Sequence, residues 1–252
     1  MTQAPGYLDV QAEVGITKHL GGFKATDELL RLCHVENGGE VLYAGCGIGV
    51  GPAYIAKKTN CRVVGVDISA RMIEWCHVRA RMAKVEQLTE FRMADILDLP
   101  FETGRFAAVL VESVVAFVGD KGKALQELIR VAKPGRYVGI NESFIYQELP
   151  PDMMELARKQ LGVDIPTLEA WQTLWDATGL QERVVKTFQL EGREQVRSQI
   201  QWVGLGWALK ALWRLYRLYR RNPGARDNIR GQFSSGASFV DKMGYGLFTG
   251  RK

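Results

Sequence analysis

The sequence predicts an α/β fold built on a doubly wound, mostly parallel sheet of seven strands, with a helical insertion before the last strand. Short apolar runs alternate with segments of helical spacing along the chain. The runs are apolar throughout, as in strands that are covered on both faces. A long helical stretch separates the last two runs. The predicted strands are 40–44, 62–66, 89–93, 106–112, 137–141, 183–188 and 243–249.

The segments before and between these strands show the spacing of helices that cover a sheet. In the first of them, Leu29, Leu30 and Cys33 fall on one side of a helical wheel. The turn Lys133-Pro134-Gly135 is expected to separate the fourth helix from the fifth strand. The predicted helices are 26–33, 52–58, 69–84, 122–130, 152–161 and 167–178, followed by about fifty residues of helical pattern after residue 188.

Composition limits the class of protein. The 252 residues are 46% hydrophobic and 24% charged, which excludes a disordered or collagen-like chain. Four cysteines without a CxxC pair argue against a zinc ribbon or a disulfide scaffold, and no metal site is expected. The first ten residues show neither a basic nor an apolar signal region, so we expect a cytoplasmic protein.

Charge is distributed unevenly. The net charge is +5, but residues 192–252 carry 12 Lys or Arg and 3 Asp or Glu, whereas residues 1–191 carry 21 and 25. A basic C-terminal quarter favours contact with an anionic partner, such as a membrane surface, a nucleic acid or an acidic substrate. A solvated basic face is the plainer alternative.

The first strand runs into a glycine-rich loop, 45–49, and a helix follows. Glycines let the backbone approach a ligand, and a helix N-terminus offers free N–H groups. Asp67 ends the next strand, where a carboxylate can accept both hydroxyls of a ribose. The loop reads GxGxG, since Val50 replaces the last glycine of a dinucleotide fingerprint. A tight turn, and an N-cap role for Asp67, are the alternatives.

Four segments in order resemble the class I S-adenosylmethionine-dependent methyltransferases, which are Rossmann-like enzymes. They are VLYAGCGIG (41–49), GVDIS (65–69), MADILDLPF (93–101) and RVAKPGRYVGI (130–140). The resemblance covers roughly residues 20–190 and implies S-adenosylmethionine as the cofactor.

The resemblance also implies roles for individual residues. The glycines would pass under the methionine and ribose, Asp67 would bind the ribose, Ile68 would pack on adenine, and Asp95 would accept from its amino group. Tyr43 stands where the family has an acid that helps to hold the cofactor's ammonium group; either its ring packs there or its hydroxyl substitutes for the acid. The implied cofactor-binding residues are Tyr43, Gly45, Cys46, Gly47, Gly49, Asp67, Ile68, Met72, Ala94, Asp95, Ile96 and Glu112.

Two residues are candidates for acid–base catalysis. Methyl transfer from a sulfonium needs a base only when the acceptor carries a proton of high pKa. Glu112 ends the fourth strand, where ligands of open α/β sheets bind. His19 precedes Gly21 and Gly22, and it is either a base over the cofactor or a capping or surface histidine. Glu142, after the fifth strand, is a weaker candidate.

Segments 19–26 and 244–252 are similar to the branch of the family that methylates phosphobases, amines, sterols and quinols. That branch often has a Tyr–His pair over an acceptor amine, and Thr17 falls near the tyrosine position, which disfavours a phosphobase. We predict an enzyme for a small, hydrophobic or lipid-linked acceptor: a quinol, a sterol or isoprenoid, or a lipid headgroup. The alternatives are a non-catalytic membrane- or partner-binding module and an RNA methyltransferase.

Residues 196–221 combine aromatic, leucine and basic side chains. At 100° per residue, Lys210, Arg214, Arg217 and Arg221 form one stripe. These charges exclude a membrane span but suit an interfacial helix on an anionic, peripheral membrane site. A lid packed on the sheet is the equal alternative. Because the aromatics lie among leucines, no nucleic acid is expected; a homodimer stays open.

These observations divide the chain into four segments. Residues 1–36 form an N-terminal cap, and 37–190 form the cofactor-binding core. Residues 191–242 are the helical lid or membrane-facing insertion, and 243–252 are the final sheet strand.

Overall fold

The computed structural model describes residues 6–146, 165–226 and 242–252, with single positions at 151, 154, 155, 158 and 229. Most of the predicted helix 152–161 lies outside the described residues.

Seven strands form one sheet, as predicted, in the order β3-β2-β1-β4-β5-β7-β6. Strands β1 to β5 are parallel, and β7 is antiparallel to both of its neighbours, β5 and β6. The final segment of the chain is thus an inner strand of the sheet. The strands are β1 Glu40–Ala44, β2 Arg62–Asp67, β3 Thr89–Met93, β4 Phe106–Glu112, β5 Ala132–Ile145, β6 Gln181–Gln189 and β7 Met243–Arg251.

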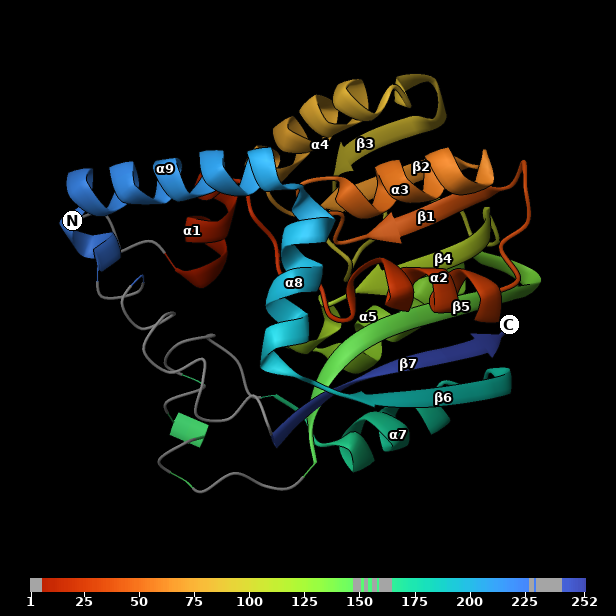
Figure 1. Cartoon of the computed structure of the whole chain (residues 1–252). Helices are drawn as coiled ribbons and strands as arrows, with labels where there is room; N and C mark the ends of the chain where they lie inside the picture. Colours follow the sequence, from red (N-terminus) through yellow and green to blue (C-terminus); the bar gives the residue numbers. More distant parts are fainter. Residues whose placement is uncertain are drawn as a thin grey trace.

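Helices cover both faces of the sheet (Figure 1). Side chains alternate along β1, so that Val41 and Tyr43 join the core under α2, α3 and α4, while Leu42 and Ala44 join the core with α5 and α7. Burial on both faces explains why this strand is apolar throughout. The helices are α2 Gly22–Leu32, α3 Val50–Thr59, α4 Ala70–Ala83, α5 Lys121–Val131 and α7 Leu168–Asp176.

The start of β5 differs from the prediction. The expected turn at Lys133-Pro134-Gly135 is part of a longer strand that already pairs at Ala132 with Phe106. The strand is irregular at the predicted turn, since the pairing register shifts before Tyr137 and Gly135 has a φ of +73°. The C-terminus satisfies this backbone, because the Gly135 N–H donates to the Lys252 carbonyl at 2.8 Å.

The predicted helical insertion before the last strand is present as α8 (Gly192–Val203) and α9 (Leu205–Arg221). Gly204, at a φ of +86°, forms the corner between them. Helix α8 packs beside α2, and α9 packs on the N-terminal helix α1 (Tyr7–Val14) (Figure 1). Within the described residues, no helix combines the length and the apolar character that crossing a bilayer requires.

Candidate active site

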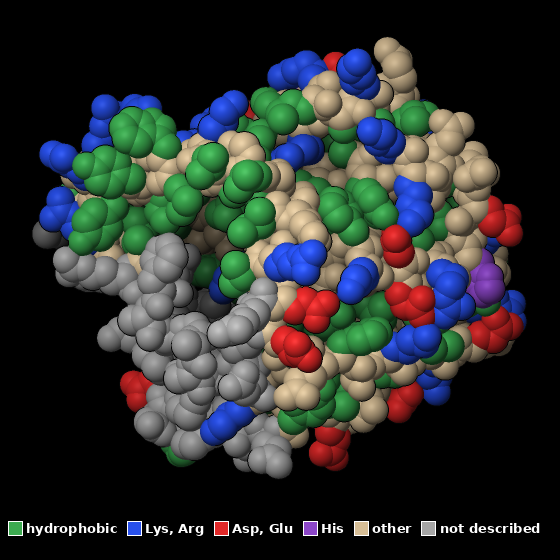
Figure 2. Space-filling model, in the orientation of Figure 1, with side chains coloured by type: hydrophobic (Ala, Val, Ile, Leu, Met, Phe, Trp, Pro, Cys, Tyr) green, Lys and Arg blue, Asp and Glu red, His purple; other side chains and the backbone are tan. Residues whose placement is uncertain are grey.

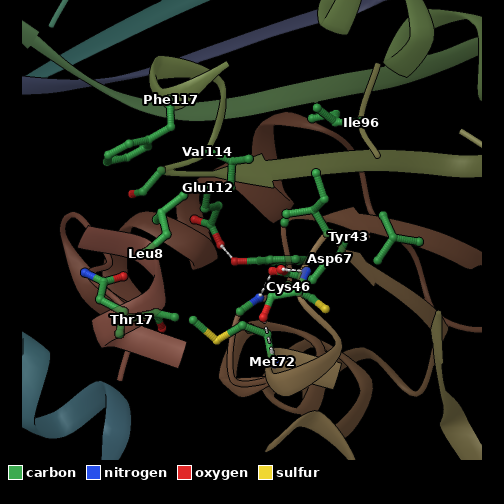
Figure 3. Close-up of a pocket in the computed structure, with 18 of the residues that line it drawn as sticks. Leu8, Thr17, Tyr43, Cys46, Asp67, Met72, Ile96, Glu112, Val114 and Phe117 are labelled. Carbon is green, nitrogen blue, oxygen red and sulfur yellow. Dashed lines mark hydrogen bonds between the residues drawn. The ribbon is translucent and has the colours of Figure 1, made fainter. Parts of the chain in front are cut away.

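A cavity of about 390 Å³ lies at the carboxyl ends of β1, β2 and β4 (Figure 3). Parallel strands end at the same edge of a sheet, so residues distant in sequence meet there. All of the predicted site residues except Gly49 and the weaker candidate Glu142 border this cavity. They are His19, Tyr43, Gly45, Cys46, Gly47, Asp67, Ile68, Met72, Ala94, Asp95, Ile96 and Glu112.

Two glycines of the loop have no room for a side chain. Gly45 has a φ of +69°, and a Cβ there would lie 2.2 Å from Val114 Cγ2. Gly47 has a φ of +52°, and its Cβ would lie 2.6 Å from Thr17 Cγ2. Both positions therefore need glycine for conformation and for space.

Gly49 has a different place from the one predicted. It precedes α3 with a φ of +79°, and a Cβ there would lie 2.8 Å from the Cys76 Cα. It does not border the cavity, so its position favours a role in packing α3 against α4 over direct contact with a cofactor.

Asp67 points from the end of β2 toward the glycine loop (Figure 3). One carboxylate oxygen accepts the Gly47 N–H at 2.9 Å, and the other accepts the Ser69 N–H at 3.0 Å. Burial raises the pKa of Asp67, and these backbone donors offset part of the rise. The hydroxyl of Ser69 caps α4 by accepting the Met72 N–H, so the N-cap alternative for Asp67 is wrong.

Apolar side chains border the part of the cavity beside Asp67. The Ile68 side chain is 66% exposed there, although it is large and apolar. Met72 and Ile96 border the same cavity and are mostly buried. Asp95 holds its own loop, because its Oδ1 accepts the Leu97 N–H at 2.9 Å. The apolar side chains offer a surface to a flat ring with a carboxylate nearby.

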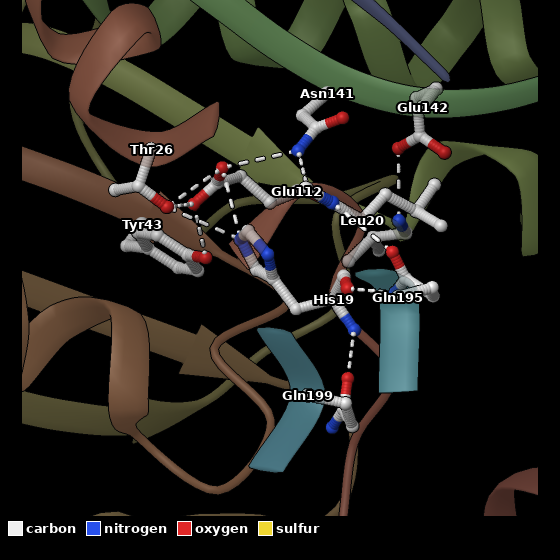
Figure 4. Close-up of polar contacts among 11 residues, drawn as sticks. His19, Leu20, Thr26, Tyr43, Glu112, Asn141, Glu142, Gln195 and Gln199 are labelled. Carbon is white, nitrogen blue, oxygen red and sulfur yellow. Dashed lines mark hydrogen bonds and ion pairs between the residues drawn. The ribbon is translucent and has the colours of Figure 1, made fainter. Parts of the chain in front are cut away.

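Glu112 lies at the centre of a buried polar network (Figure 4). Its carboxylate accepts from the Tyr43 hydroxyl at 2.8 Å, the Thr26 hydroxyl at 3.0 Å and the Asn141 amide at 3.4 Å, and it contacts His19 Nε2 at 3.1 Å. Burial raises the pKa of Glu112, but the interaction with His19, which is strongest when that ring is protonated, and the hydrogen bonds from Tyr43 and Thr26 outweigh burial and hold the pKa below its ordinary value. The side chain is fully buried, so it acts on a ligand through these neighbours.

His19 is a buried residue at the cavity wall, so the surface-histidine alternative is wrong. Its ring stacks on Trp202 with centroids 3.8 Å apart. Because a carboxylate only accepts hydrogen bonds, the contact with Glu112 places the ring proton on Nε2. In the neutral ring Nδ1 then carries the lone pair, and this atom has no partner within the described part of the chain. His19 therefore has the arrangement of an oriented base.

Helix α8 holds the segment that carries His19. Gln195 donates to the His19 carbonyl at 2.6 Å, and Gln199 accepts the His19 N–H at 3.1 Å and donates to the Thr17 carbonyl. We call Gln195, Gln199 and Trp202 the α8 clamp. No local sequence pattern predicts a role for these residues, or for Thr26 and Asn141, because they come together with His19 only in the folded chain.

Beyond His19 the cavity is lined mainly by apolar side chains of α1 and of the short helix η2 (Val115–Phe117). The rings of Tyr7 and Phe117 stack with centroids 5.9 Å apart, and Leu8 stands beside them (Figure 3). Lys18 Nζ lies 5.4 Å from the Tyr7 ring centroid, and burial lowers the pKa of Lys18. We call this part the outer chamber.

Glu142 supports the chamber wall from behind. Its carboxylate accepts the backbone N–H groups of Val114 at 2.9 Å, Val115 at 2.7 Å and Ala116 at 3.2 Å. Burial raises its pKa to about 7 against these donors. It does not border the cavity, so its position does not favour the weaker prediction of a catalytic role.

The described residues contain no group of three or more His, Cys, Asp or Glu side chains able to hold a metal ion. Residues 42–140 match a family model described as a methyltransferase domain. The match runs from β1 to the middle of β5 and includes the glycine loop and Asp67. Residues 42–140 thus resemble a methyltransferase domain. The predicted resemblance to the methyltransferase family is confirmed.

Individual relatives share this domain. Phosphoethanolamine N-methyltransferase 1 of Zea mays is 30% identical over 151 residues, which is 60% of this chain and 30% of that protein. The crystal structure of the [4+2]-cyclase SpnF has a TM-score of 0.77 at 18% identity and covers 99% of this chain and 98% of its own. A third similar structure is phosphoethanolamine N-methyltransferase 2 of Haemonchus contortus in complex with phosphomonomethylethanolamine and S-adenosylhomocysteine. Its TM-score is 0.75 at 18% identity, and the match covers 97% of this chain and 57% of that chain. The chain therefore spans about a third of the length of the maize relative.

Proposed function

We propose that the protein transfers a methyl group from S-adenosylmethionine to a small, apolar acceptor with an acidic hydroxyl, such as a quinol. One observation carries this proposal. A single cavity joins the glycine loop and Asp67 to the apolar outer chamber, and His19 borders it with an unpaired Nδ1.

The cofactor fits the inner half of the cavity. Each carboxylate oxygen of Asp67 has used one lone pair on a backbone N–H, and each retains another for a ribose hydroxyl. Ile68 and Met72 would pack on adenine, and Asp95 would accept from its amino group. The Tyr43 hydroxyl donates to anionic Glu112, which makes its oxygen a better acceptor for the cofactor's ammonium group.

The bound cofactor supplies an electrophilic methyl group on sulfur. An acceptor oxygen that took this methyl group from sulfur would have to lose its proton. His19 Nδ1 takes the proton, while Glu112 fixes the tautomer and stabilises the imidazolium. Glu112 is thus a positioning residue and His19 the catalytic base.

The outer chamber favours a quinol over a phosphobase. Lys18 is the one cationic side chain among the described residues that border the cavity. A phosphate group would need charged partners there, whereas Tyr7, Leu8 and Phe117 offer apolar and aromatic surface to a ring. Sterols, isoprenoids and lipid headgroups are the nearest alternatives.

Methyl-labelled S-adenosylmethionine tests the proposal against a panel of quinols, phenols, sterols, phosphobases and RNA. We expect label on a quinol or phenol oxygen and tight cofactor binding by calorimetry. Label found only on phosphobases or RNA would overturn the acceptor class. Because a protein of this fold is named a cyclase, binding without transfer to any acceptor would instead indicate a non-transferring relative. No cofactor binding at millimolar concentration would refute the whole assignment.

A further inference from the structure

Helix α9 presents an apolar face that no described residue covers. Its large apolar side chains at helical spacing are between 50% and 65% exposed. Soluble monomers rarely expose apolar side chains contiguously in this way, so such a patch marks an interaction site. The α9 apolar face consists of Leu205, Leu209, Leu212, Trp213 and Tyr216.

The opposite side of α9 is already used for packing. Trp207 is buried and donates to the Gly15 carbonyl at 2.6 Å, and Arg214 donates to the Val14 carbonyl at 2.6 Å. The Arg214 guanidinium also lies 4.7 Å from the Trp75 ring centroid. Arg214, predicted to belong to the basic stripe, is therefore half-buried on the packed side of the helix. The helix is fixed with its apolar face outward.

Basic side chains border this face. Lys210, Arg217 and Arg221 are exposed and form no ion pair within the described ranges, and α9 itself has no acidic residue. Figure 2 shows hydrophobic side chains along α9 with Lys and Arg around them. Aromatic rings beside cations suit the boundary between lipid tails and phosphates.

We infer that the α9 apolar face docks on a bilayer that contains anionic phospholipid, with the helix lying in the plane of the interface. Leucine side chains enter the acyl region, Trp213 and Tyr216 lie at the boundary, and Lys210 and Arg217 meet lipid phosphates. Helix α1, on which α9 packs, carries Tyr7 and Leu8 of the outer chamber. Docking therefore places one wall of the chamber close to the lipid.

Charge favours a lipid surface over a second copy of the chain. Residues 192–252 carry 12 basic and 3 acidic side chains, so two copies of this face would bring like charges together. An anionic bilayer neutralises the same charges and accepts the apolar side chains.

Vesicle flotation tests this inference on the full chain. We expect flotation with phosphatidylcholine–phosphatidylglycerol vesicles and little with pure phosphatidylcholine. The double variant Leu209→Glu/Leu212→Glu should bind at least about a hundredfold more weakly, since each leucine loses roughly tenfold. Lys210→Ala/Arg217→Ala should lose about fivefold per charge, on the anionic vesicles alone.

The matched control is Met82→Glu, which changes a similarly exposed apolar residue on α4 and should float like the unmodified chain. Circular dichroism and S-adenosylmethionine binding verify that each variant folds. Absence of flotation of the unmodified chain would overturn the inference. So would a dimer in sedimentation that the leucine variant dissociates without any vesicle binding, because the face would then belong to a second copy. Neither result depends on turnover, so the proposed function stands or falls separately.

Discussion

The inner half of the cavity and its outer chamber are built in different ways. The inner half comes from strand ends and the segments that follow them, between residues 43 and 112, and most of its predicted cofactor residues lie at or just after the end of a strand. The outer chamber and His19 depend on α1 and on α8 from the other end of the chain. The predicted cofactor site is thus formed by one continuous part of the sequence, whereas the proposed acceptor site is assembled from distant segments.

The largest expected effect separates catalysis from cofactor binding. In His19→Ala the methyl-transfer rate should fall by about 10²–10⁴-fold, because the acceptor loses its base. Cofactor affinity should change little, since Asp67 and the glycine loop are intact. Stopped assays at saturating cofactor, with calorimetry beside them, measure both. His77→Ala, an exposed histidine on α4, is the control and should keep full activity.

The reverse pattern is expected in the inner half. Asp67→Ala removes two charge-assisted hydrogen bonds to the ribose and the support of the Gly47 N–H, so cofactor affinity should fall by about a hundredfold. The rate at saturating cofactor should fall much less. Asp176→Ala, a surface residue paired with Arg183, serves as the control. Equal losses of rate in the Asp67 and His19 variants would contradict the division into two halves.

Glu142, which supports the wall of the outer chamber, should make the free energy of unfolding depend on pH. Because the pKa of Glu142 in the folded state is about 7 and its ordinary value is 4.5, the folded state keeps a proton that the unfolded chain has lost. The contribution of this group to the free energy of unfolding is complete below pH 4.5. It falls by about 3 kcal/mol as the pH rises from 4.5 through 7. Chemical unfolding of the unmodified chain and of Glu142→Gln, compared between these pH values, measures the difference. A difference that does not vary with pH would refute this assignment.

The smallest effect concerns the α8 clamp. Gln199→Ala removes two hydrogen bonds to the His19 segment, and the free energy of unfolding should fall by about 1–2 kcal/mol. The acceptor KM should rise while cofactor affinity is kept, since only the outer chamber loosens. Gln201→Ala, exposed on the same helix, is the control. A loss of cofactor affinity as large as the rise in KM would show that the two halves are not separable.

The cofactor residues that the resemblance implies mostly border one cavity, because they are local in the sequence. Gly45, Gly47 and Asp67 follow strand ends, and parallel pairing brings such ends together whatever the rest of the chain does. Gly49 was expected to contact the cofactor but packs against Cys76. The pattern of glycines does not say which of them faces a ligand.

Periodicity in the sequence, read one segment at a time, determined the seven strands, the covering helices and the amphipathic character of α9. Only the tertiary structure decided which side of α9 is buried, that Arg214 faces inward and that Glu112 is enclosed by Tyr43, Thr26, His19 and Asn141. The physical reason is the separation along the sequence between the residues that interact. A repeat of hydrophobic residues specifies a local conformation, but the partner of a buried charge comes from whatever distant segment packs against it.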